Sequence, residues 1–215
     1  MDKQLTILSH MAAAPHRSLF LAGALQGVLT VVWWVFDLTG RYGLAGTMIN
    51  WSVSPTWAHA FLMIYVFFPF FIFGFLFTTY PNWMNGDKVR PREYVMTCAA
   101  MAAGVMLFYA GLLTHKAISI AGVELMLAGW SVAVYVLFRI LLTTPAQDKR
   151  HARVTSVALL MGWLGVAAYL AWLVTDSPVV LNFARHAGIW FFLLPIVLTV
   201  SHRMIPFFSS RVLDN

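Results

Sequence analysis

Apolar residues along this chain gather into six long runs that are separated by short polar segments. Each run is long enough to cross the hydrocarbon core of a bilayer, which takes roughly 20 helical residues. With edges good to a few residues, the runs cover 18–38, 56–79, 94–114, 118–142, 154–174 and 182–204. A spanning segment must satisfy its own backbone hydrogen bonds, and no alternating barrel pattern occurs. The pattern therefore predicts an all-α, integral membrane bundle of about six transmembrane helices, forming one domain over residues 1–215.

Composition supports the membrane prediction and removes other classes. The chain is 60% hydrophobic and 10% charged, whereas a soluble domain carries about 25% charged residues. Its pI is about 9.8, but the basic residues lie in short clusters between apolar runs, so no nucleic-acid partner is expected. The one cysteine, Cys98, excludes an intrachain disulfide and a CxxC metal site.

Lysine and arginine fall unevenly on the two sides of the predicted bundle. One side holds ten of them, which are Lys3, Arg17, Lys88, Arg90, Arg92, Lys149, Arg150, Arg153, Arg203 and Arg211. The other side holds three, which are Arg41, Lys116 and Arg185. Basic segments stay on the inside, so both the N- and C-termini are expected to be cytoplasmic. Arg139 lies near the cytoplasmic end of the fourth run, where its side chain can snorkel.

Few polar groups lie inside the runs, and an ionisable residue within a membrane is a functional candidate by default. Glu124 and Asp37 are interpreted as interfacial residues that touch water. Beyond Thr30, Ser131 and Ser156, little polarity falls at mid-depth. The sequence has no paired-carboxylate relay, no phosphate-binding glycine loop and no Ser-His-Asp arrangement, so it identifies no site of catalytic turnover.

The second run is rich in aromatic rings, with Pro69 in its middle. The rings are those of Phe61, Tyr65, Phe67, Phe68, Phe70, Phe71, Phe73, Phe75 and Phe77. They could form the walls of a porphyrin pocket, or they could face lipid and other helices. Proline removes a backbone donor, so Pro69 should loosen the helix there. Gly104 on the third run, and Gly162 and Gly165 on the fifth, predict close helix contacts.

Six of the seven histidines lie at or inside a predicted helix end. With the orientation above, His59, His115 and His186 fall toward the periplasmic side. His16, His151 and His202 fall toward the cytoplasmic side. Imidazole is a common protein ligand of haem iron and copper. This distribution makes histidine the main candidate for a metal or cofactor ligand.

Each histidine also has a plainer interpretation as a partly solvated interfacial residue. That interpretation is favoured for His115 and His151, which sit in polar loops. It remains open beside the ligand interpretation for the other four. His186 and His202 are roughly 24 Å apart along one helix, so they would serve two sites at different depths.

Three separated motifs resemble the NnrS family of bacterial membrane proteins. The first is PHR at 15–17, followed by FLAGA at 20–24. The second is HAFLM at 59–63, followed by GFLFTTYPNW at 74–83, and the third is TVSHRMIPFF at 199–208. The motifs occur in the family's order, and the resemblance extends over nearly the whole chain.

The resemblance implies a haem- and copper-containing protein of the bacterial inner membrane, linked to the response to nitric oxide and nitrosative stress. Nitric oxide is then a possible ligand. His16, His59 and His202 fall on histidines of the family's motifs, and His186 precedes the last helix as the resemblance leads us to expect. These four are the candidate cofactor ligands, and His59, His186 and His202 are the candidate metal ligands.

This chain departs from the family in two respects. Many members read His-Ala-His-Glu where residues 59–62 are HAFL, so a metal site built on the second histidine and the glutamate would be altered. Members are also about twice as long, so the chain resembles an N-terminal half. We therefore expect a homo-oligomer, or a partner that carries a second half.

Three functions remain in competition. The first is a haem- and copper-binding protein of the nitric oxide response. The second is a b-type cytochrome-like electron carrier, whose haem would have both axial positions filled. The third is a half-size transporter or channel-like subunit, which would need a polar path through the membrane.

Overall fold

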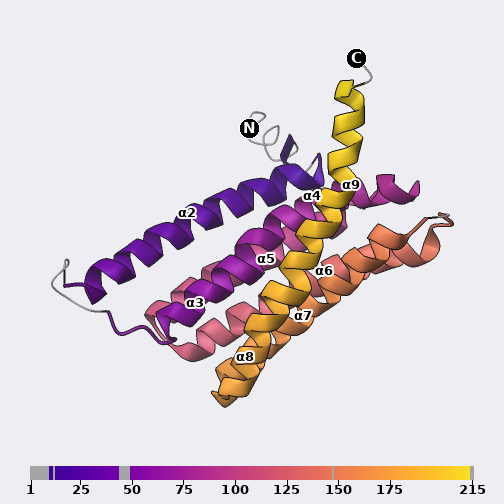
Figure 1. Cartoon of the computed structure of the whole chain (residues 1–215). Helices are drawn as coiled ribbons and strands as arrows, with labels where there is room; N and C mark the ends of the chain where they lie inside the picture. Colours follow the sequence, from indigo (N-terminus) through magenta and orange to yellow (C-terminus); the bar gives the residue numbers. More distant parts are fainter. Residues whose placement is uncertain (1–9, 12, 44–48, 147, 214–215) are drawn as a thin grey trace.

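A computed structural model describes residues 10–11, 13–43, 49–146 and 148–213. Its helices are α2 (Pro15–Arg41), α3 (Pro55–Phe61), η1 (Leu62–Phe67), α4 (Phe68–Met84), α5 (Pro91–Leu113), α6 (Lys116–Thr143), α7 (Arg150–Thr175), α8 (Pro178–His186), η2 (Ala187–Leu193) and α9 (Leu194–Leu213). The segments α3–η1–α4 and α8–η2–α9 are each one continuous helix, so the described chain has six helices long and apolar enough to span a membrane. The predicted all-α membrane fold is confirmed (Figure 1).

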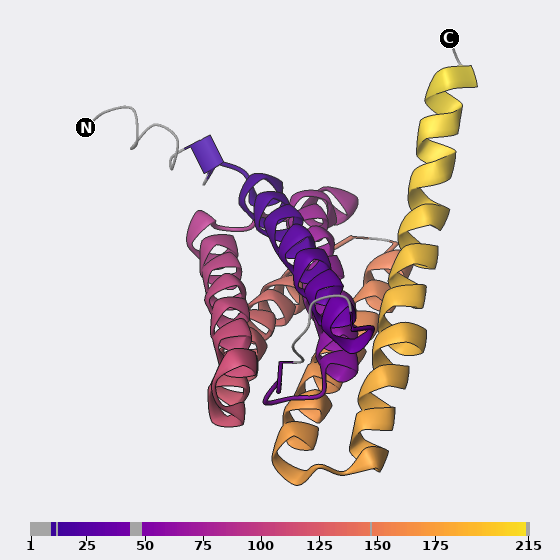
Figure 2. The same ribbon diagram turned by 90° about the vertical axis from the view of Figure 1, so that its left-hand side faces the viewer.

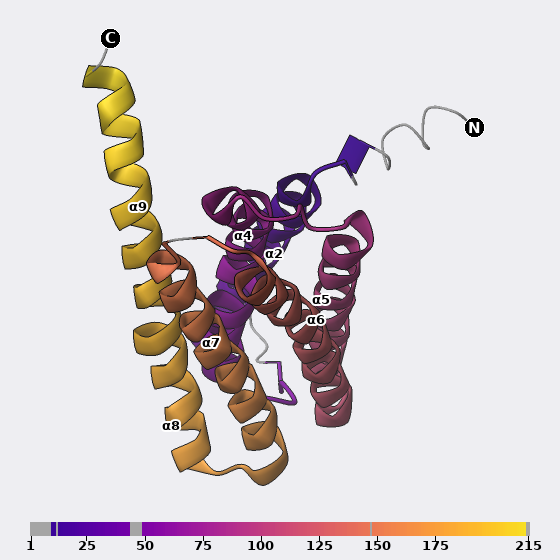
Figure 3. The same ribbon diagram turned by 90° about the vertical axis from the view of Figure 1, so that its right-hand side faces the viewer.

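Successive helices run in opposite directions, which gives the bundle two distinct ends. At one end, called the terminal end below, α2, α5 and α7 begin and α4, α6 and α9 finish. The other end, called the opposite end below, holds the remaining helix ends. The α5–α6 hairpin lies at one edge and α9 at the other, with α2 and α4 between them (Figures 2 and 3). The last turns of α9 extend past the rest of the bundle at the terminal end (Figure 1).

Prolines set where four of the helices begin. Pro15, Pro55, Pro91 and Pro178 occupy the first turn of α2, α3, α5 and α8. Proline suits this position because its missing N–H would have no helical acceptor there and its φ is already helical. The helices therefore start before the apolar runs do, within polar sequence that hydropathy alone leaves outside the membrane.

Two of the membrane crossings contain a turn of π-helix, and each of these turns ends just before a proline. Leu62–Phe67 precedes Phe68-Pro69, and Ala187–Leu193 precedes Leu194-Pro195. The missing donor at Pro69 is the one that would bond the carbonyl of Tyr65 four residues earlier. The Trp130 indole N–H of α6 donates to that carbonyl instead, at 3.2 Å. The expected loosening at Pro69 thus takes the form of a π-turn supported by a neighbouring helix.

The aromatic rings of the second crossing mostly fill the core between helices. Phe70, Phe73 and Phe77 are at most 2% exposed, whereas Phe68 is 41% exposed. The Phe73 ring meets the Trp130 ring edge to face, with centroids 4.8 Å apart. Offset and edge-to-face contacts of this kind stabilise a core beyond the area that they bury.

Glycines bring the helix backbones close together. A Cβ at Gly104 would lie 2.6 Å from the Gly122 carbonyl oxygen, and one at Gly162 would lie 2.8 Å from the Trp130 ring. A Cβ at Gly165 would overlap the Tyr65 hydroxyl. The predicted small-residue contacts on α5 and α7 are therefore confirmed for these glycines. Arg139, expected to snorkel, forms a two-pronged ion pair with Glu93 of α5, at 2.5 and 3.0 Å.

The Gly165 contact leads to a test of the core. Gly165→Ala should lower the free energy of unfolding by roughly 1–3 kcal/mol, because the added methyl overpacks against Tyr65. The Tyr65 hydroxyl has little freedom to move, since it donates to the Ala184 carbonyl and packs on Gly188. In a Tyr65→Phe background the overlapped oxygen is gone, so Gly165→Ala should cost less. Unfolding in a graded detergent mixture measures both costs; equal costs in the two backgrounds would contradict the contact.

Candidate metal and cofactor site

Two histidines from different helices meet at the terminal end of the bundle. His151 lies in the first turn of α7, and His202 lies in α9. Their ring atoms His151 Nε2 and His202 Nδ1 are 3.0 Å apart, and the ring centroids are 5.3 Å apart. This is hydrogen-bond distance for two nitrogens, so one ring donates and the other accepts.

The chemistry of imidazole limits what this pair can offer to a metal. A neutral imidazole carries one N–H and one lone pair. The hydrogen bond uses one of each, so the neutral pair keeps one outward N–H and one outward lone pair. The lone pair lies on His202 Nε2 when His202 donates, and on His151 Nδ1 when His151 donates. A ligating histidine that gives its other N–H to a fixed partner is the usual arrangement around protein-bound metals.

The histidine pair faces a cavity of about 560 Å3. Its wall is formed by Thr79, Asn82 and Trp83 of α4, by His151, and by His202, Arg203, Met204 and Pro206 of α9. The Arg203 guanidinium lies over the Trp83 ring, 5.0 Å from its centroid. The volume falls within the range of about 300–1,000 Å3 that small-molecule and cofactor sites occupy.

The residues around this cavity fit a haem in kind. An imidazole or the Met204 thioether can ligate iron. Arg203 offers a guanidinium to the carboxylates of the porphyrin, a pairing that is charge-assisted. One atom of the pair itself, His151 Nδ1, is buried and has no hydrogen-bond partner among the described residues. A polar atom left in this way is open to a ligand.

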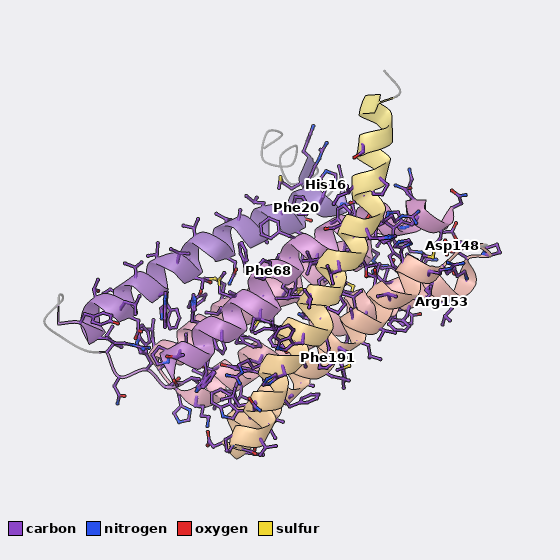
Figure 4. The ribbon with its side chains drawn as sticks, viewed as in Figure 1. His16, Phe20, Phe68, Asp148, Arg153 and Phe191 are labelled. Atoms are coloured by element: carbon purple, nitrogen blue, oxygen red, sulfur yellow. The ribbon has the colours of Figure 1, made fainter. Side chains whose placement is uncertain are left out.

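His16 lies at the same end of the bundle but belongs to α2. Its Nδ1 is 3.4 Å from Thr78 Oγ1, one residue before a lining residue of the cavity, and its ring lies edge-on to Phe20 with centroids 6.1 Å apart. Figure 4 shows His16 at the start of α2, at the end of the bundle that also carries Asp148 and Arg153. The structure therefore brings His16 near this site without placing it in the cavity wall.

His59 lies at the opposite end, in α3, and stacks on the Trp34 ring of α2. The centroids are 4.3 Å apart and the planes differ by 15°. The Arg41 guanidinium also lies over Trp34, 5.2 Å from its centroid. His59 Nδ1 is buried and has no partner in the described part of the chain. This nitrogen is the polar atom that His59 could still offer to a ligand.

His186 is exposed near the same opposite end, at the last residue of α8. Its Nδ1 lies 2.8 Å from the Asn182 carbonyl oxygen, so Nδ1 donates and Nε2 keeps its lone pair. Within the described ranges, no group of three or more His, Cys, Asp or Glu side chains could hold a metal ion. The four ligand assignments made from the sequence stay predictions.

Sequence reasoning underrated His151 and did not single out Arg203 as a site residue. The usable signal was the depth of the histidines, because His151 and His202 were both expected on the cytoplasmic side. Helices that follow each other in sequence tend to pack as antiparallel neighbours. The start of α7 and the end of the last helix are then adjacent, which brings these two residues together.

The fold and this site define a class: a six-helix membrane protein with a histidine pair beside a cavity at one end. Residues 10–215 match the family model of the NnrS protein, so the chain belongs to the NnrS family and the resemblance found in its motifs is confirmed. Neither the curated proteins nor the solved structures give a match.

The hydrogen bond between the two histidines makes a quantitative prediction. A double-mutant cycle of His151→Ala and His202→Ala should show a coupling of about 0.5–1.5 kcal/mol near neutral pH, the typical net value of one hydrogen bond. Unfolding of the wild type and the three variants measures this coupling. A coupling near zero would contradict the hydrogen bond.

Proposed function

We propose that this chain is a haem- and copper-binding protein of the bacterial inner membrane that takes part in the response to nitric oxide or nitrosative stress. Membership of the NnrS family suggests a membrane protein related to nitric oxide. The observation that supports the haem most directly is the His151–His202 pair, which presents one outward lone pair beside a cavity of about 560 Å3.

His202 is the proposed ligand and His151 its hydrogen-bond partner. His202 Nδ1 donates to His151 Nε2 in this arrangement, which leaves His202 Nε2 for the iron. Arg203 binds the porphyrin carboxylates, and Trp83 offers an aromatic surface to the ring. When bound, haem iron supplies a coordination position at which a diatomic molecule such as nitric oxide can bind.

The geometry of the pair favours this function over an electron carrier with two histidine ligands. Two histidine nitrogens that both ligated one iron would each give it a lone pair, so neither could carry the proton of a hydrogen bond between them. The nitrogens of His151 and His202 are 3.0 Å apart and share a proton. The pair therefore offers one ligand to an iron, and a second protein ligand would have to come from elsewhere.

Copper enters the proposal through the family, and no cluster of three ligand side chains that could hold it occurs in the described part of the chain. His59 and His186 stay the candidates at the opposite end. The charge distribution makes the terminal end cytoplasmic in this proposal, so the haem lies toward the cytoplasm and His59 toward the periplasm.

An optical spectrum of the purified full chain, supplied with haem, tests the proposal. The Soret band should shift on reduction and shift again with nitric oxide. His202→Ala should abolish the band, and His151→Ala should weaken haem binding about 10–100-fold, the usual cost of losing such a partner. His115→Ala is the control, since it removes an exposed histidine at the other end of the bundle that is not one of the four candidate ligands.

Each contrary result has a definite meaning. A colourless wild-type protein would contradict the proposal that this chain binds haem. A band that survives His202→Ala and disappears with His59→Ala would move the haem to the opposite end. A six-coordinate, low-spin spectrum that does not change when nitric oxide is added would favour the electron carrier.

We also propose that the chain works as a homo-oligomer, or with a partner that carries a second half. Helix α2 offers a face for such a neighbour, on which Leu25, Val28 and Val32 are 60–66% exposed. Light scattering of the protein in a mild detergent should give a mass above one chain plus its micelle. A stable, monodisperse monomer would contradict the proposal.

A further inference from the structure

The inner face of α2 buries a series of polar groups that the haem proposal does not use. Gln26, Thr30, Trp33 and Asp37 recur at helical spacing, and their exposed fractions are 5, 0, 8 and 7%. Eleven residues of helix rise about 16 Å. This series therefore runs from the opposite end of the bundle through about half of a hydrocarbon core that is roughly 30 Å thick.

The inner part of this series is a hydrogen-bonded chain. The Gln26 side-chain amide donates to Thr30 Oγ1 at 2.7 Å, and Thr30 Oγ1 is 2.8 Å from the Tyr109 hydroxyl of α5. The same amide nitrogen lies 3.4 Å from the Leu62 carbonyl oxygen at the start of η1. Because a carbonyl can only accept, this contact sets which way the Gln26 amide faces.

The outer part is a buried carboxylate near the opposite end of the bundle. The Trp51 indole donates to Asp37 Oδ1 at 2.8 Å, and Arg41 Nε lies 2.6 Å from Asp37 Oδ2. Asp37 was interpreted as an interfacial carboxylate in water, but its side chain is only 4% exposed. The Arg41 side chain is 33% exposed and so connects this buried ion pair to solvent.

Two buried polar atoms on this face of α2 lack a hydrogen-bond partner. Gln26 Oε1 is an acceptor and Trp33 Nε1 is a donor, and neither has a hydrogen-bond partner in the described part of the chain. The two residues are seven positions apart, about 10 Å along the helix, so they cannot bond each other. The Trp33 ring lies between Tyr109 and Trp51, with centroid distances of 6.1 and 5.5 Å.

We propose that this face of α2, together with Tyr109 and Trp51, binds a short file of water molecules that extends from the opposite end of the bundle to η1 at mid-membrane. Water both donates and accepts, so one file satisfies the Gln26 acceptor at its inner end and the Trp33 donor nearer the surface. Buried waters occur where otherwise unsatisfied polar groups converge. The file reaches halfway through the membrane, so it hydrates the core without forming a through-channel.

Hydroxyl-radical footprinting of the full chain in lipid nanodiscs tests this proposal, because X-rays generate radicals from water and these oxidise the side chains beside it. Trp130 is the matched dry control for Trp33. It is 0% exposed, and its indole N–H is satisfied by the Tyr65 carbonyl. Trp33 should oxidise at least about ten times faster than Trp130, as read by mass spectrometry.

Two variants distinguish the proposed water file from bulk water at the surface of the bundle. Gln26→Leu removes the inner acceptor, so Trp33 oxidation should fall toward the Trp130 rate; Thr30→Val is the second choice if that variant does not fold. Ser131→Ala removes an exposed hydroxyl on α6 and should leave the Trp33 rate unchanged. Equal rates for Trp33 and Trp130 in the wild type would overturn the proposal, as would rapid Trp33 oxidation that persists in both Gln26→Leu and Thr30→Val.

Discussion

Backbone hydrogen bonding in lipid is the constraint on which the rest of this structure depends. The bilayer core offers no water to a carbonyl that has lost its helical donor. Pro69 removes the donor for Tyr65, and the π-turn η1 rearranges the bonds around it. Side chains of neighbouring helices serve the affected carbonyls: Trp130 donates to Tyr65, and Gln26 reaches Leu62. The irregular turn thus ties the second crossing to α2 and α6.

The second π-turn extends the same arrangement to the last crossing. The Tyr65 hydroxyl donates to the carbonyl of Ala184, just before η2, and packs between Gly165 and Gly188. One side chain therefore joins three crossings near the centre of the bundle. The position of α9 depends on this junction, and α9 carries His202. The geometry of the cavity at the terminal end is in this sense set by contacts at mid-membrane.

The two ends of the bundle have different chemistry. The terminal end has an open cavity with a histidine pair and an arginine, which suits a ligand with carboxylates and a metal centre. The opposite end has a buried ion pair, two indoles that meet edge to face and the polar face of α2. Between them lies a dry aromatic core in which Phe73, Trp130 and Phe192 meet edge to face. The proposed water file stops at this core, which separates the hydrated half of the bundle from the proposed haem site.

Hydropathy and three motifs were enough to predict six helices and the NnrS family, because each rests on local composition or on short contiguous segments. The orientation drawn from the positive-inside rule stays a prediction. Pro69 likewise predicted an irregularity in its own helix. Pro195 carries the same signal, but the sequence analysis did not use it. The pairing of His151 with His202 and the chain from Gln26 through Thr30 to Tyr109 were decided by tertiary structure. They join residues 51 and 79 positions apart, and their geometry depends on how the helices are rotated against one another. That rotation is set by close packing of glycines and aromatic rings, which periodicity along one chain does not encode.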